Sequence, residues 1–310
     1  MSDMDLLVER LRAAGLSAES ADEAGGGVVA VAGMVTLGGG APLAARTVFA
    51  KTLRTPGADL FEVEAEGLRV LRDLGGVTTP DVLAATPDVL VLRPLGPRRD
   101  DERFWADLGR MVAGMHTTAR SERFGWHRDG WLGRLRQDNT WDDDGHSFFA
   151  RRRILRWLRE PQAEAAFDRA DREALERLCA ALPELVPPLP PVLTHGDLWC
   201  GNVLSDLGGD PALIDPAVSY CWAEADLSML WCSPRPPVSD RFFTAYEEVA
   251  PLEDGWRDRM PVLHLRELLS IVAHGDDDWG AARAVRETAA PFARRPRSSG
   301  NRWTADGMTG

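Results

Sequence analysis

Three side chains in the segment 192–215 have types and spacing that suit metal binding and proton transfer: Asp197, Asn202 and Asp215. The segment ends at Asp215, and its apolar runs at 203–205 and 212–214 flank a turn rich in Asp, Gly and Pro. This pattern predicts a β-hairpin, which places its outer flanks, Asn202 and Asp215, side by side. One amide oxygen and one carboxylate oxygen, with room for water and phosphates, suit Mg²⁺ better than zinc.

Asp197 lies on the loop that leads into this hairpin, five residues before Asn202. A carboxylate at that point can accept the proton of a substrate hydroxyl. We expect His195, two residues earlier, to shape the loop by hydrogen bonding rather than to act as the base. The pattern Asp-x-x-x-x-Asn, followed by an Asp at the end of a strand, is the arrangement of protein-kinase-type phosphoryl transfer.

Lys51 is the one lysine among the 36 basic residues of the chain. An ammonium is a compact point charge that a planar guanidinium does not replace, so its retention suggests a specific role, and chance is the alternative. Apolar spacing predicts a helix over 58–74, with Glu64 on its apolar stripe and Glu62 and Glu66 on the opposite face. A buried carboxylate needs a partner, for which Lys51 is the candidate. The alternative places Glu64 at the rim of a solvated face.

The elements that position these groups divide the chain into a β-rich and an α-rich part. Strands are predicted at 28–37, 46–51, 82–83 and 88–92. Helices are predicted at about 104–115, 147–160, 164–182, 225–232, 240–249, 257–273 and 279–290. We therefore expect an α+β bilobal fold. Its parts are a small β-rich lobe with one main helix over 1–92, a Pro- and Gly-containing hinge at 93–97, a larger, mostly helical lobe over 98–293, and a frayed tail over 294–310.

Length and composition exclude several classes of protein. The 310 residues are 44% hydrophobic and 27% charged, which suits a folded chain with a sizeable core. The formal net charge of −12 disfavours nucleic acid and anionic membranes as partners. The uncharged stretch 24–45 contains seven glycines, which favours turns and a strand over a membrane helix. The first residues lack the pattern of a signal peptide, so we expect a cytoplasmic protein.

The four cysteines, at 179, 200, 221 and 232, show no CxxC spacing. We therefore expect reduced thiols rather than disulfides or a zinc site. The chain contains no GxSxG nucleophile elbow, which excludes the hydrolases that depend on that motif.

Several stretches together resemble the fructosamine kinase (ketosamine 3-kinase) family, a branch of the aminoglycoside-phosphotransferase-like group with the protein-kinase-like fold. The similarity extends over most of residues 20–290. Its most specific parts are His195-Gly-Asp-Leu-Trp-Cys-Gly-Asn202-Val and Ile214-Asp-Pro-Ala, with Thr47-Val-Phe-Ala-Lys51 and Leu135-Arg-Gln-Asp-Asn-Thr-Trp141 in support. The resemblance implies ATP- and Mg²⁺-dependent phosphorylation of a sugar hydroxyl on a ketosamine, such as a fructosyl- or ribulosyl-amine, by direct in-line transfer.

The resemblance also implies roles for the matching residues. Asp197 would orient the sugar hydroxyl and accept its proton, while Asn202 and Asp215 would hold Mg²⁺. Asp226 would brace the catalytic loop, and the plainer alternative is a first-turn helix carboxylate. The ATP-binding residues would be Gly25, Gly26, Gly27, Lys51, Glu64, Arg93 and Leu95. Among these, the glycines would let the backbone approach the phosphates, and Lys51 would pair with Glu64 and contact the α- and β-phosphates.

The acceptor side is less well defined by the sequence. The candidate substrate residues are Trp126, Gln137, Asn139, Trp141 and Trp222. The alternative for the tryptophans is a lid that packs on the larger lobe. The chain departs from the family pattern at Arg93, at Cys200 and over 219–226. The last of these departures bears on the identity of the acceptor.

Two other functions remain open. One is an O-phosphotransferase for an aminoglycoside or another small metabolite, and the other is a nucleotide-binding pseudokinase. A pseudokinase predicts the loss of at least one catalytic group, whereas all of them are present. We expect a small-molecule sugar-amine as partner, no nucleic acid or membrane, and a monomer or weak dimer.

Overall fold

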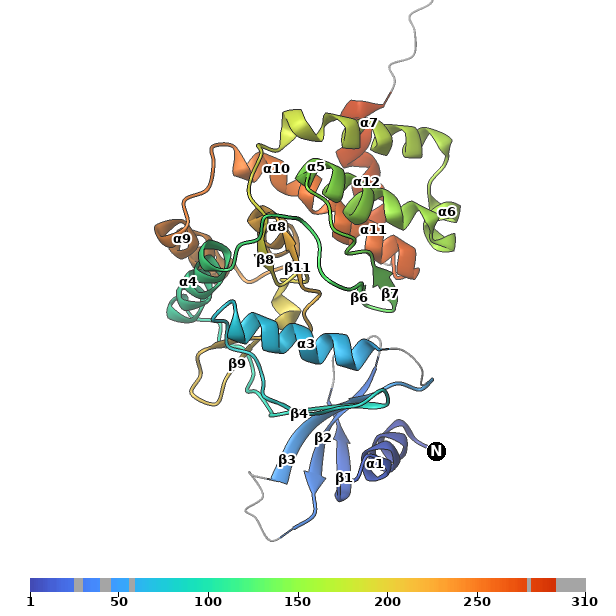
Figure 1. Ribbon diagram of the computed structural model, residues 1–310, viewed down its shortest axis with the longest axis vertical. Coiled ribbons are helices and arrows are strands. Elements are labelled where there is room, and N and C mark those ends of the chain that lie inside the picture. Colours follow the sequence, from blue (N-terminus) through green and yellow to red (C-terminus); the bar gives the residue numbers. More distant parts are fainter. Residues whose placement is uncertain (25–29, 40–45, 56–58, 278–279, 294–310) are drawn as a thin grey trace, which may run out of the picture.

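The computed structural model describes residues 1–24, 30–39, 46–55, 59–277 and 280–293. Figure 1 shows a sheet-containing part below a larger, mostly helical part. The strands are β1 (Ala18–Glu23), β2 (Val31–Leu37), β3 (Thr47–Thr52), β4 (Val82–Ala85), β5 (Val89–Leu92), β6 (Gly130–Leu132), β7 (Leu135–Gln137), β8 (Val192–Thr194), β9 (Val203–Ser205), β10 (Pro211–Leu213) and β11 (Ser219–Cys221). The α-helices are α1 (Asp3–Ala13), α3 (Leu60–Asp73), α4 (Glu102–Thr118), α5 (Gly145–Phe148), α6 (Pro161–Ala166), α7 (Arg169–Leu185), α8 (Ala223–Cys232), α9 (Asp240–Val249), α10 (Trp256–Leu263), α11 (Leu265–His274) and α12 (Ala281–Ala289).

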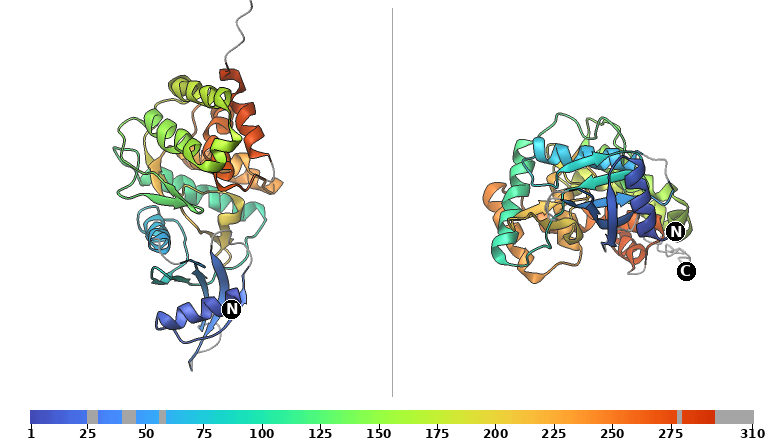
Figure 2. Two further views of the ribbon diagram at one scale, coloured as in Figure 1. Left: turned by 90° about the vertical axis from the view of Figure 1, so that its right-hand side faces the viewer. Right: turned by 90° about the horizontal axis from the view of Figure 1, so that it is seen from below.

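The N-terminal sheet is antiparallel, with strand order β1-β2-β3-β5-β4. Successive side chains of a strand point to opposite faces, and this alternation separates two small cores. Val48 and Ala50 of β3 pack with Leu7 and Leu11 of α1 on one face. Phe49 packs with the Phe61 face of α3 on the other. Figure 2 shows the two helices on opposite sides of the sheet.

The sequence analysis predicted α3 and the strands β2 to β5 but not α1 or β1. α1 begins at a capping box, in which Ser2 and Asp5 each accept a hydrogen bond from the other's backbone N–H. β1 is an edge strand with mostly exposed polar residues, so its sequence carries little alternation. The small lobe therefore contains a second helix beside the predicted one.

The C-terminal part surrounds a single large hydrophobic core built from α4 and most later elements. Three predicted helices are divided in the structure. The helix predicted at 164–182 becomes α6 and α7, because Asp168 caps the start of α7. The helix predicted at 257–273 becomes α10 and α11, which meet at His264, three residues after Pro261. The segment predicted as a helix at 147–160 is a short α-helix followed by a π-helix and a 3₁₀-helix.

Two short sheets shape the boundary between the parts. β9 and β10 form the predicted hairpin, with Val203 opposite Leu213, and β8 pairs with β11. The backbone of Gly96, in the segment predicted as a hinge, exchanges two hydrogen bonds with Ser205 at 2.7 and 3.0 Å. Within the described residues, no helix has both the length and the apolar character needed to cross a bilayer.

Candidate active site

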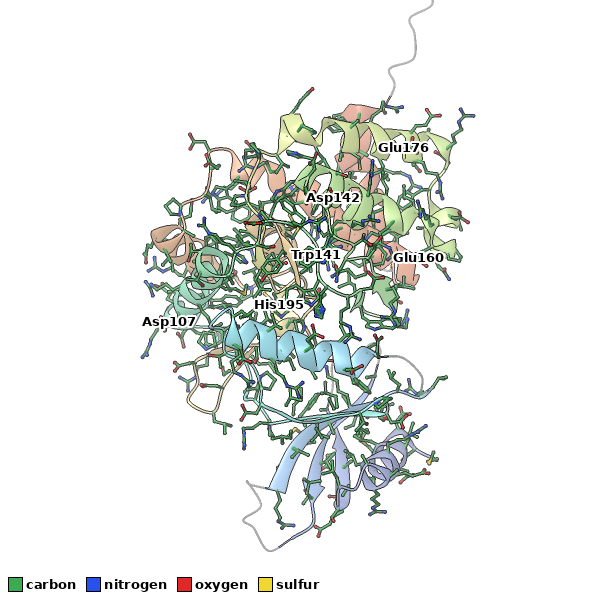
Figure 3. The ribbon with its side chains drawn as sticks, viewed as in Figure 1. Asp107, Trp141, Asp142, Glu160, Glu176 and His195 are labelled. Carbon is green, nitrogen blue, oxygen red and sulfur yellow. The ribbon has the colours of Figure 1, made fainter. Side chains whose placement is uncertain are left out.

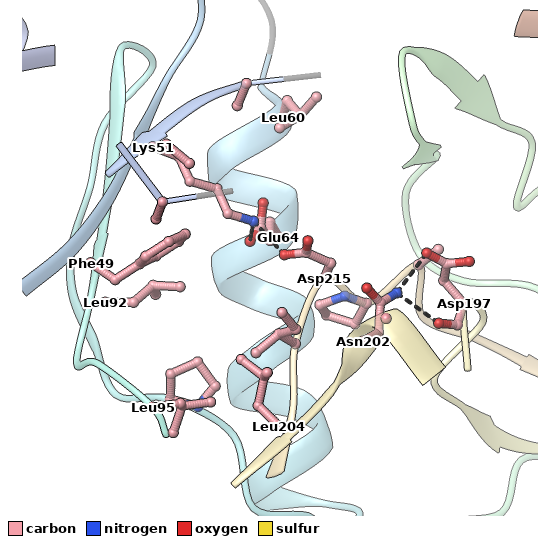
Figure 4. A pocket seen from close by; sticks show the side chains of 18 of the residues that line it. Phe49, Lys51, Leu60, Glu64, Leu92, Leu95, Asp197, Asn202, Leu204 and Asp215 are labelled. Carbon is pink, nitrogen blue, oxygen red and sulfur yellow. Dashed lines mark hydrogen bonds and ion pairs between the residues drawn. The ribbon is translucent and has the colours of Figure 1, made fainter. Parts of the chain in front are cut away.

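A cavity of about 770 Å³ lies between the N-terminal sheet and the β9–β10 hairpin. Figure 4 shows side chains from both parts of the molecule on its walls. Five polar residues predicted for catalysis and for phosphate or metal binding line it: Lys51, Glu64, Asp197, Asn202 and Asp215. The structure therefore brings together residues that are up to 164 positions apart in the sequence.

Lys51 lies on β3 between two carboxylates. Its Nζ is 2.8 Å from Oε1 of Glu64, and it also pairs with Oδ1 of Asp215. Lys51 and Glu64 are both 9% exposed, so this pair is nearly dry, whereas the side chain of Asp215 is 39% exposed. Burial opposes the charge of Lys51, but Asp215 and Glu64 outweigh it and raise the pKa of the ammonium. Burial raises the pKa of Glu64 to about 7, against the attraction of Lys51.

The predicted pairing of Glu64 with Lys51 follows from two periodicities. Lys51 has the same parity as Phe49 on β3, so both side chains point to the α3 face of the sheet. Glu64 lies on the buried stripe of α3, with Phe61 and Leu68. The alternative of a solvated Glu64 is wrong.

Asp197 and Asn202 meet across the loop at 195–202, which the sequence predicts to be the catalytic loop. The Nδ2 group of Asn202 donates to the backbone oxygen of Asp197 at 2.8 Å and to its Oδ2 at 2.7 Å. Asn202 is 5% exposed, and its backbone oxygen accepts from Ile214 N–H at 3.1 Å. Asp215, which follows Ile214, is thereby held next to Asn202, as strand pairing predicted.

Asp226 holds the loop that carries Asp197. Its Oδ2 accepts from the backbone N–H of His195 at 2.6 Å, and its Oδ1 accepts from that of Gly196 at 2.7 Å. Nε2 of His116 lies 3.3 Å from the same Oδ2. Asp226 is 1% exposed, so it is a buried acceptor and not a solvated first-turn carboxylate. Burial would raise its pKa, but the hydrogen bonds from His116 and from the backbone of Gly196 keep the pKa of Asp226 below its ordinary value.

His195 lies at the junction of the two parts (Figure 3) and is fully buried. Its Nε2 is 3.0 Å from the backbone oxygen of Ile214, and its Nδ1 accepts from Asp197 N–H at 3.2 Å. Burial lowers the pKa of His195 and favours the neutral ring, despite the nearby Asp226. The ring therefore ties this loop to Ile214, the residue between β10 and Asp215.

Two backbone conformations in the site are unusual. Gly196 has φ +79°, and a Cβ there would overlap the backbone oxygen of Ala217, so the loop requires glycine. Asp215 has φ +54°, a left-handed value that few residues other than glycine adopt. Both residues lie where the catalytic loop crosses the segment after β10.

The pKa of Asp197 is raised well above its ordinary value. Burial is the main cause, and the carboxylate of Glu267 on α11 adds to it, while Arg266 and the bond from Asn202 oppose it. Oε2 of Glu267 is buried without a hydrogen-bond partner among the described residues. Sequence reasoning did not identify Glu267 or Arg266, because no motif surrounds them and α11 begins 68 residues after Asp197.

The side of the cavity that the sequence predicts to bind the nucleotide is mostly apolar. Phe49, Leu92 and Leu204 line it, with Arg93 and Leu95 at the predicted hinge. The N–H of Arg93 donates to Asp81 at 2.9 Å, whereas that of Leu95 has no partner among the described residues. The predicted phosphate contacts of Gly25, Gly26 and Gly27 lie outside the described residues.

The predicted substrate residues do not form one wall. Gln137 and Asn139 are each 1% exposed and bond to buried arginines: Arg266 donates to Gln137 at 2.6 Å and Arg153 to Asn139 at 2.8 Å. Trp222 is 1% exposed and stacks on Phe149. None of these three lines the cavity, and neither does Trp126 or Trp141, which pack on Tyr220. Among the described residues, the tryptophans that line it are Trp131 and Trp199.

The donor set fits Mg²⁺ better than a transition metal. Asn202 and Asp215 offer amide and carboxylate oxygens at neighbouring positions, the ligands that Mg²⁺ prefers. Among the described residues, no group of three or more His, Cys, Asp or Glu side chains is arranged to hold a metal ion. With Asn202 and Asp215 as protein ligands, water and nucleotide phosphates would complete the coordination, as is usual for Mg²⁺.

Comparison with known proteins identifies the family. The model of the family described as "Fructosamine kinase" matches residues 3–283. This chain belongs to the fructosamine kinase family. It is 32% identical over 227 residues to "Probable ketoamine kinase" of Enterococcus faecium, covering 71% of this chain and 79% of that protein. It is 29% identical over 237 residues to the chloroplastic protein-ribulosamine 3-kinase of Arabidopsis thaliana, covering 73% and 70%.

The fold agrees with this family assignment. A crystal structure from Thermobifida fusca, provisionally assigned as a fructosamine-3-kinase, superimposes with a TM-score of 0.81 at 31% identity, covering 94% of this chain and 99% of that one. The predicted α+β bilobal fold and the predicted family are confirmed. A kinase family uses ATP as its phosphoryl donor, so this fructosamine kinase family member is an enzyme that transfers phosphate to a hydroxyl.

Proposed function

We propose that this enzyme phosphorylates a sugar hydroxyl of a ketosamine, a fructosyl- or ribulosyl-amine, with Mg·ATP as donor. The observation that supports the proposal is that the predicted phosphate-binding groups and the predicted proton acceptor line one cavity. Lys51, with its carboxylate partners, faces the nucleotide side, and the linked pair Asp197 and Asn202 faces the loop side. The family relationship supports a ketosamine as the acceptor.

In this proposal, Lys51 binds the α- and β-phosphates and Glu64 keeps its ammonium in place. A lysine suits this role because a point charge with three donors can contact phosphate and carboxylate oxygens together. The free N–H of Leu95 and the apolar wall around Phe49 would hold the adenine. Because the Lys51–Glu64 pair is nearly dry, the charge of Lys51 acts on the phosphates with little screening by water.

Asp197 orients the attacking hydroxyl and accepts its proton at Oδ1 or Oδ2. The bond from Asn202 to Oδ2 fixes the orientation of the carboxylate before the acceptor arrives. Transfer is direct: the bond from the sugar oxygen to phosphorus forms as the bond from phosphorus to the bridging β,γ-oxygen breaks, and ADP leaves. The chain contributes mainly positioning and electrostatic stabilisation.

Asn202 and Asp215 would hold Mg²⁺. When bound, the ion would neutralise charge on the β- and γ-phosphates. Asp215 now pairs with Lys51, so we expect its carboxylate to be shared between that ammonium and the ion. The left-handed backbone at Asp215 would aim the side chain toward both.

The test is mass spectrometry of products formed from Mg·ATP and a mixture of fructosyl-lysine, ribulosyl-lysine and several aminoglycosides. We expect a phosphorylated ketosamine from the unaltered enzyme. Asp197→Asn should lower turnover by about 10²- to 10⁴-fold, the range for a lost general base, while ATP still binds. Asp210→Asn is the matched control, because this exposed carboxylate lies on the β9–β10 turn. Phosphorylated aminoglycoside alone, or full turnover by Asp197→Asn, would refute the proposal.

A further inference from the structure

Part of the polar face of α3 lies against the C-terminal part of the molecule, whereas Glu62 on the same face is 71% exposed. Asp59 is the N-cap residue of α3, and Glu66 follows two turns later on the same face. The side chains of both are 27% exposed. Both contact the segment 126–137, which includes β6 and β7, and Figure 1 shows these strands beside one end of α3.

Arg128 joins the two carboxylates. Its Nη2 donates to Oδ2 of Asp59 at 2.7 Å, and its Nη1 donates to Oε2 of Glu66 at 3.3 Å. A guanidinium has donors on several sides of a rigid plane, so one arginine can hold two carboxylates at a fixed separation, which an ammonium on a flexible stem cannot do as well. We call Asp59, Glu66 and Arg128 the α3 clamp.

The Asp59 end of the clamp reaches the wall of the cavity. Asp59 also forms an ion pair with Arg136, whose Nη2 lies 2.7 Å from Oδ1, and it accepts from Trp131 Nε1 at 3.0 Å. The guanidinium of Arg136 lies over the Trp131 ring, 4.0 Å from its centroid. Trp131 lines the cavity, so the carboxylate that begins α3 also fixes a side chain of the candidate site.

The Glu66 end contacts two further rings of the same segment. Oε1 of Glu66 lies 3.1 Å from Trp126 Nε1 and 2.6 Å from His127 Nε2. With Arg128, three consecutive residues of the C-terminal part therefore bond to one side chain of α3. Trp126, which the sequence suggested as a substrate residue, contacts α3 instead of lining the cavity.

The segment that holds α3 is itself anchored in the core. Asn139 donates from Nδ2 to the backbone oxygen of Arg128 at 3.2 Å, and its backbone N–H donates to Asp129 at 2.9 Å. The Oδ1 of Asn139 accepts from Arg153, which is 2% exposed. The clamp therefore connects α3 to a buried and well-bonded frame.

α3 links this frame to the catalytic residues. It carries Glu64, which pairs with Lys51, and Gly67 approaches the segment after Asp215 so closely that an added Cβ would lie 2.9 Å from Cγ of Pro216. Any shift of α3 would therefore change the distance between Glu64 and Lys51 and disturb the residue next to Asp215.

We propose that Arg128 is a positioning residue of this enzyme. Together with Asp59 and Glu66, it holds α3 where Glu64 can pair with Lys51, and through Asp59 it couples this pair to Trp131, which also lines the cavity. The nucleotide phosphates and the acceptor are thus aligned through one arginine that touches neither of them. The part of the proposal that concerns catalysis rests on the proposed function.

The test compares Arg128→Ala with Arg123→Ala in the full-length enzyme. Arg123 is the matched control, because it lies five residues earlier and pairs with Asp143 within the C-terminal part, away from α3. The measurements are amide hydrogen exchange of peptides from 60–73 and the affinity for a non-hydrolysable ATP analogue in the presence of Mg²⁺. The kcat and the KM for ATP are measured with a ketosamine as acceptor.

We expect Arg128→Ala to increase exchange in α3 but not in α1. We also expect it to weaken nucleotide binding roughly 5- to 30-fold, because α3 would leave the position in which Glu64 pairs with Lys51 in a larger fraction of the molecules. The KM for ATP should rise in proportion, and Arg123→Ala should change none of these quantities. Unchanged exchange in α3 together with unchanged nucleotide affinity in Arg128→Ala would overturn the proposal.

Two further variants separate the clamp from a general loss of structure. The double variant Glu66→Gln with Arg128→Ala should lose less nucleotide affinity than the two single losses combined, because both substitutions remove the same contact. Arg128→Lys should restore part of the nucleotide affinity, since it keeps the charge but not the fork. Strict additivity with no rescue would overturn the proposal. If no ketosamine is phosphorylated, the proposed function fails, while exchange and nucleotide affinity still decide the role of Arg128.

Discussion

Asp226→Asn tests whether one buried carboxylate holds the catalytic loop in place. The substitution keeps the shape of the side chain but replaces one acceptor oxygen by an amide group. In the native structure, Oδ1 and Oδ2 accept from two successive backbone N–H groups, those of Gly196 and His195. An asparagine can accept only one of these bonds, and its NH₂ group would face the other donor.

The expected loss follows from these contacts. A hydrogen bond to a charged group contributes about 1.5–3 kcal/mol, and a buried donor left without a partner costs about 1–3 kcal/mol more. Because the side chain is 1% exposed, water does not replace the lost acceptor. We expect a fall of about 3–5 kcal/mol in the free energy of unfolding, a large part of the 5–15 kcal/mol typical of a folded protein.

The assay is denaturant unfolding of the native enzyme and Asp226→Asn, with kcat measured under native conditions. Displacement of the loop by about 1 Å would lower kcat by roughly 10²-fold, since Asp197 lies on it. Asp143→Asn is the control: this carboxylate is 81% exposed, so its pair with Arg123 should be worth less than about 1 kcal/mol. A loss below 1 kcal/mol with unchanged kcat in Asp226→Asn would refute the reasoning.

Two further predictions concern stability. Gly109→Ala should destabilise the protein by about 1–3 kcal/mol, because the added Cβ would overlap the backbone of Phe242 where α9 packs on α4. The control is Gly114→Ala on the same helix, whose Cβ would meet nothing within 4 Å and which should stabilise the protein by up to about 1 kcal/mol. Denaturant unfolding measures both changes in the free energy of unfolding. The pKa of Asp226 is lower in the folded state than in the unfolded state, where it is about 3.9. The stability that this difference contributes is complete above the unfolded-state pKa and is lost as pH falls through the folded-state pKa. The difference in unfolding free energy between the native enzyme and Asp226→Asn should therefore shrink from about pH 5 toward pH 3.

The parts of the site that the sequence predicted are those fixed by local rules. Strand pairing alone places Asn202 beside Asp215, because both flank one short hairpin. The pairing of Lys51 with Glu64 needed two elements, but each side chain was assigned to a buried face by its own periodicity. Short hairpins and regular helices leave few alternatives, so these predictions did not depend on the rest of the fold.

The predictions for the acceptor side depended on long-range packing and were less informative. Gln137 and Asn139 have the side chains expected of sugar-binding residues, and their local sequence contains nothing that indicates burial. Arg153 and Arg266 reach them from helical segments 16 and 129 residues away from Gln137, and they use the amide oxygens inside the core. A sequence motif shows that an amide is required but not which partner it serves.

The α3 clamp illustrates a more general limit of periodicity. The hydrophobic stripe of α3 correctly identifies the face that packs on the sheet, and by the same rule it assigns Glu66 to the opposite, polar face. Periodicity does not say whether that polar face meets water or another part of the chain. Here Glu66 bonds to Arg128, which lies 62 residues later in the sequence. A charge pattern typical of a solvated surface therefore forms a contact between the two parts of the enzyme. Polar faces of helices that carry a catalytic residue therefore merit testing as positioning surfaces, even where they resemble ordinary solvated surface.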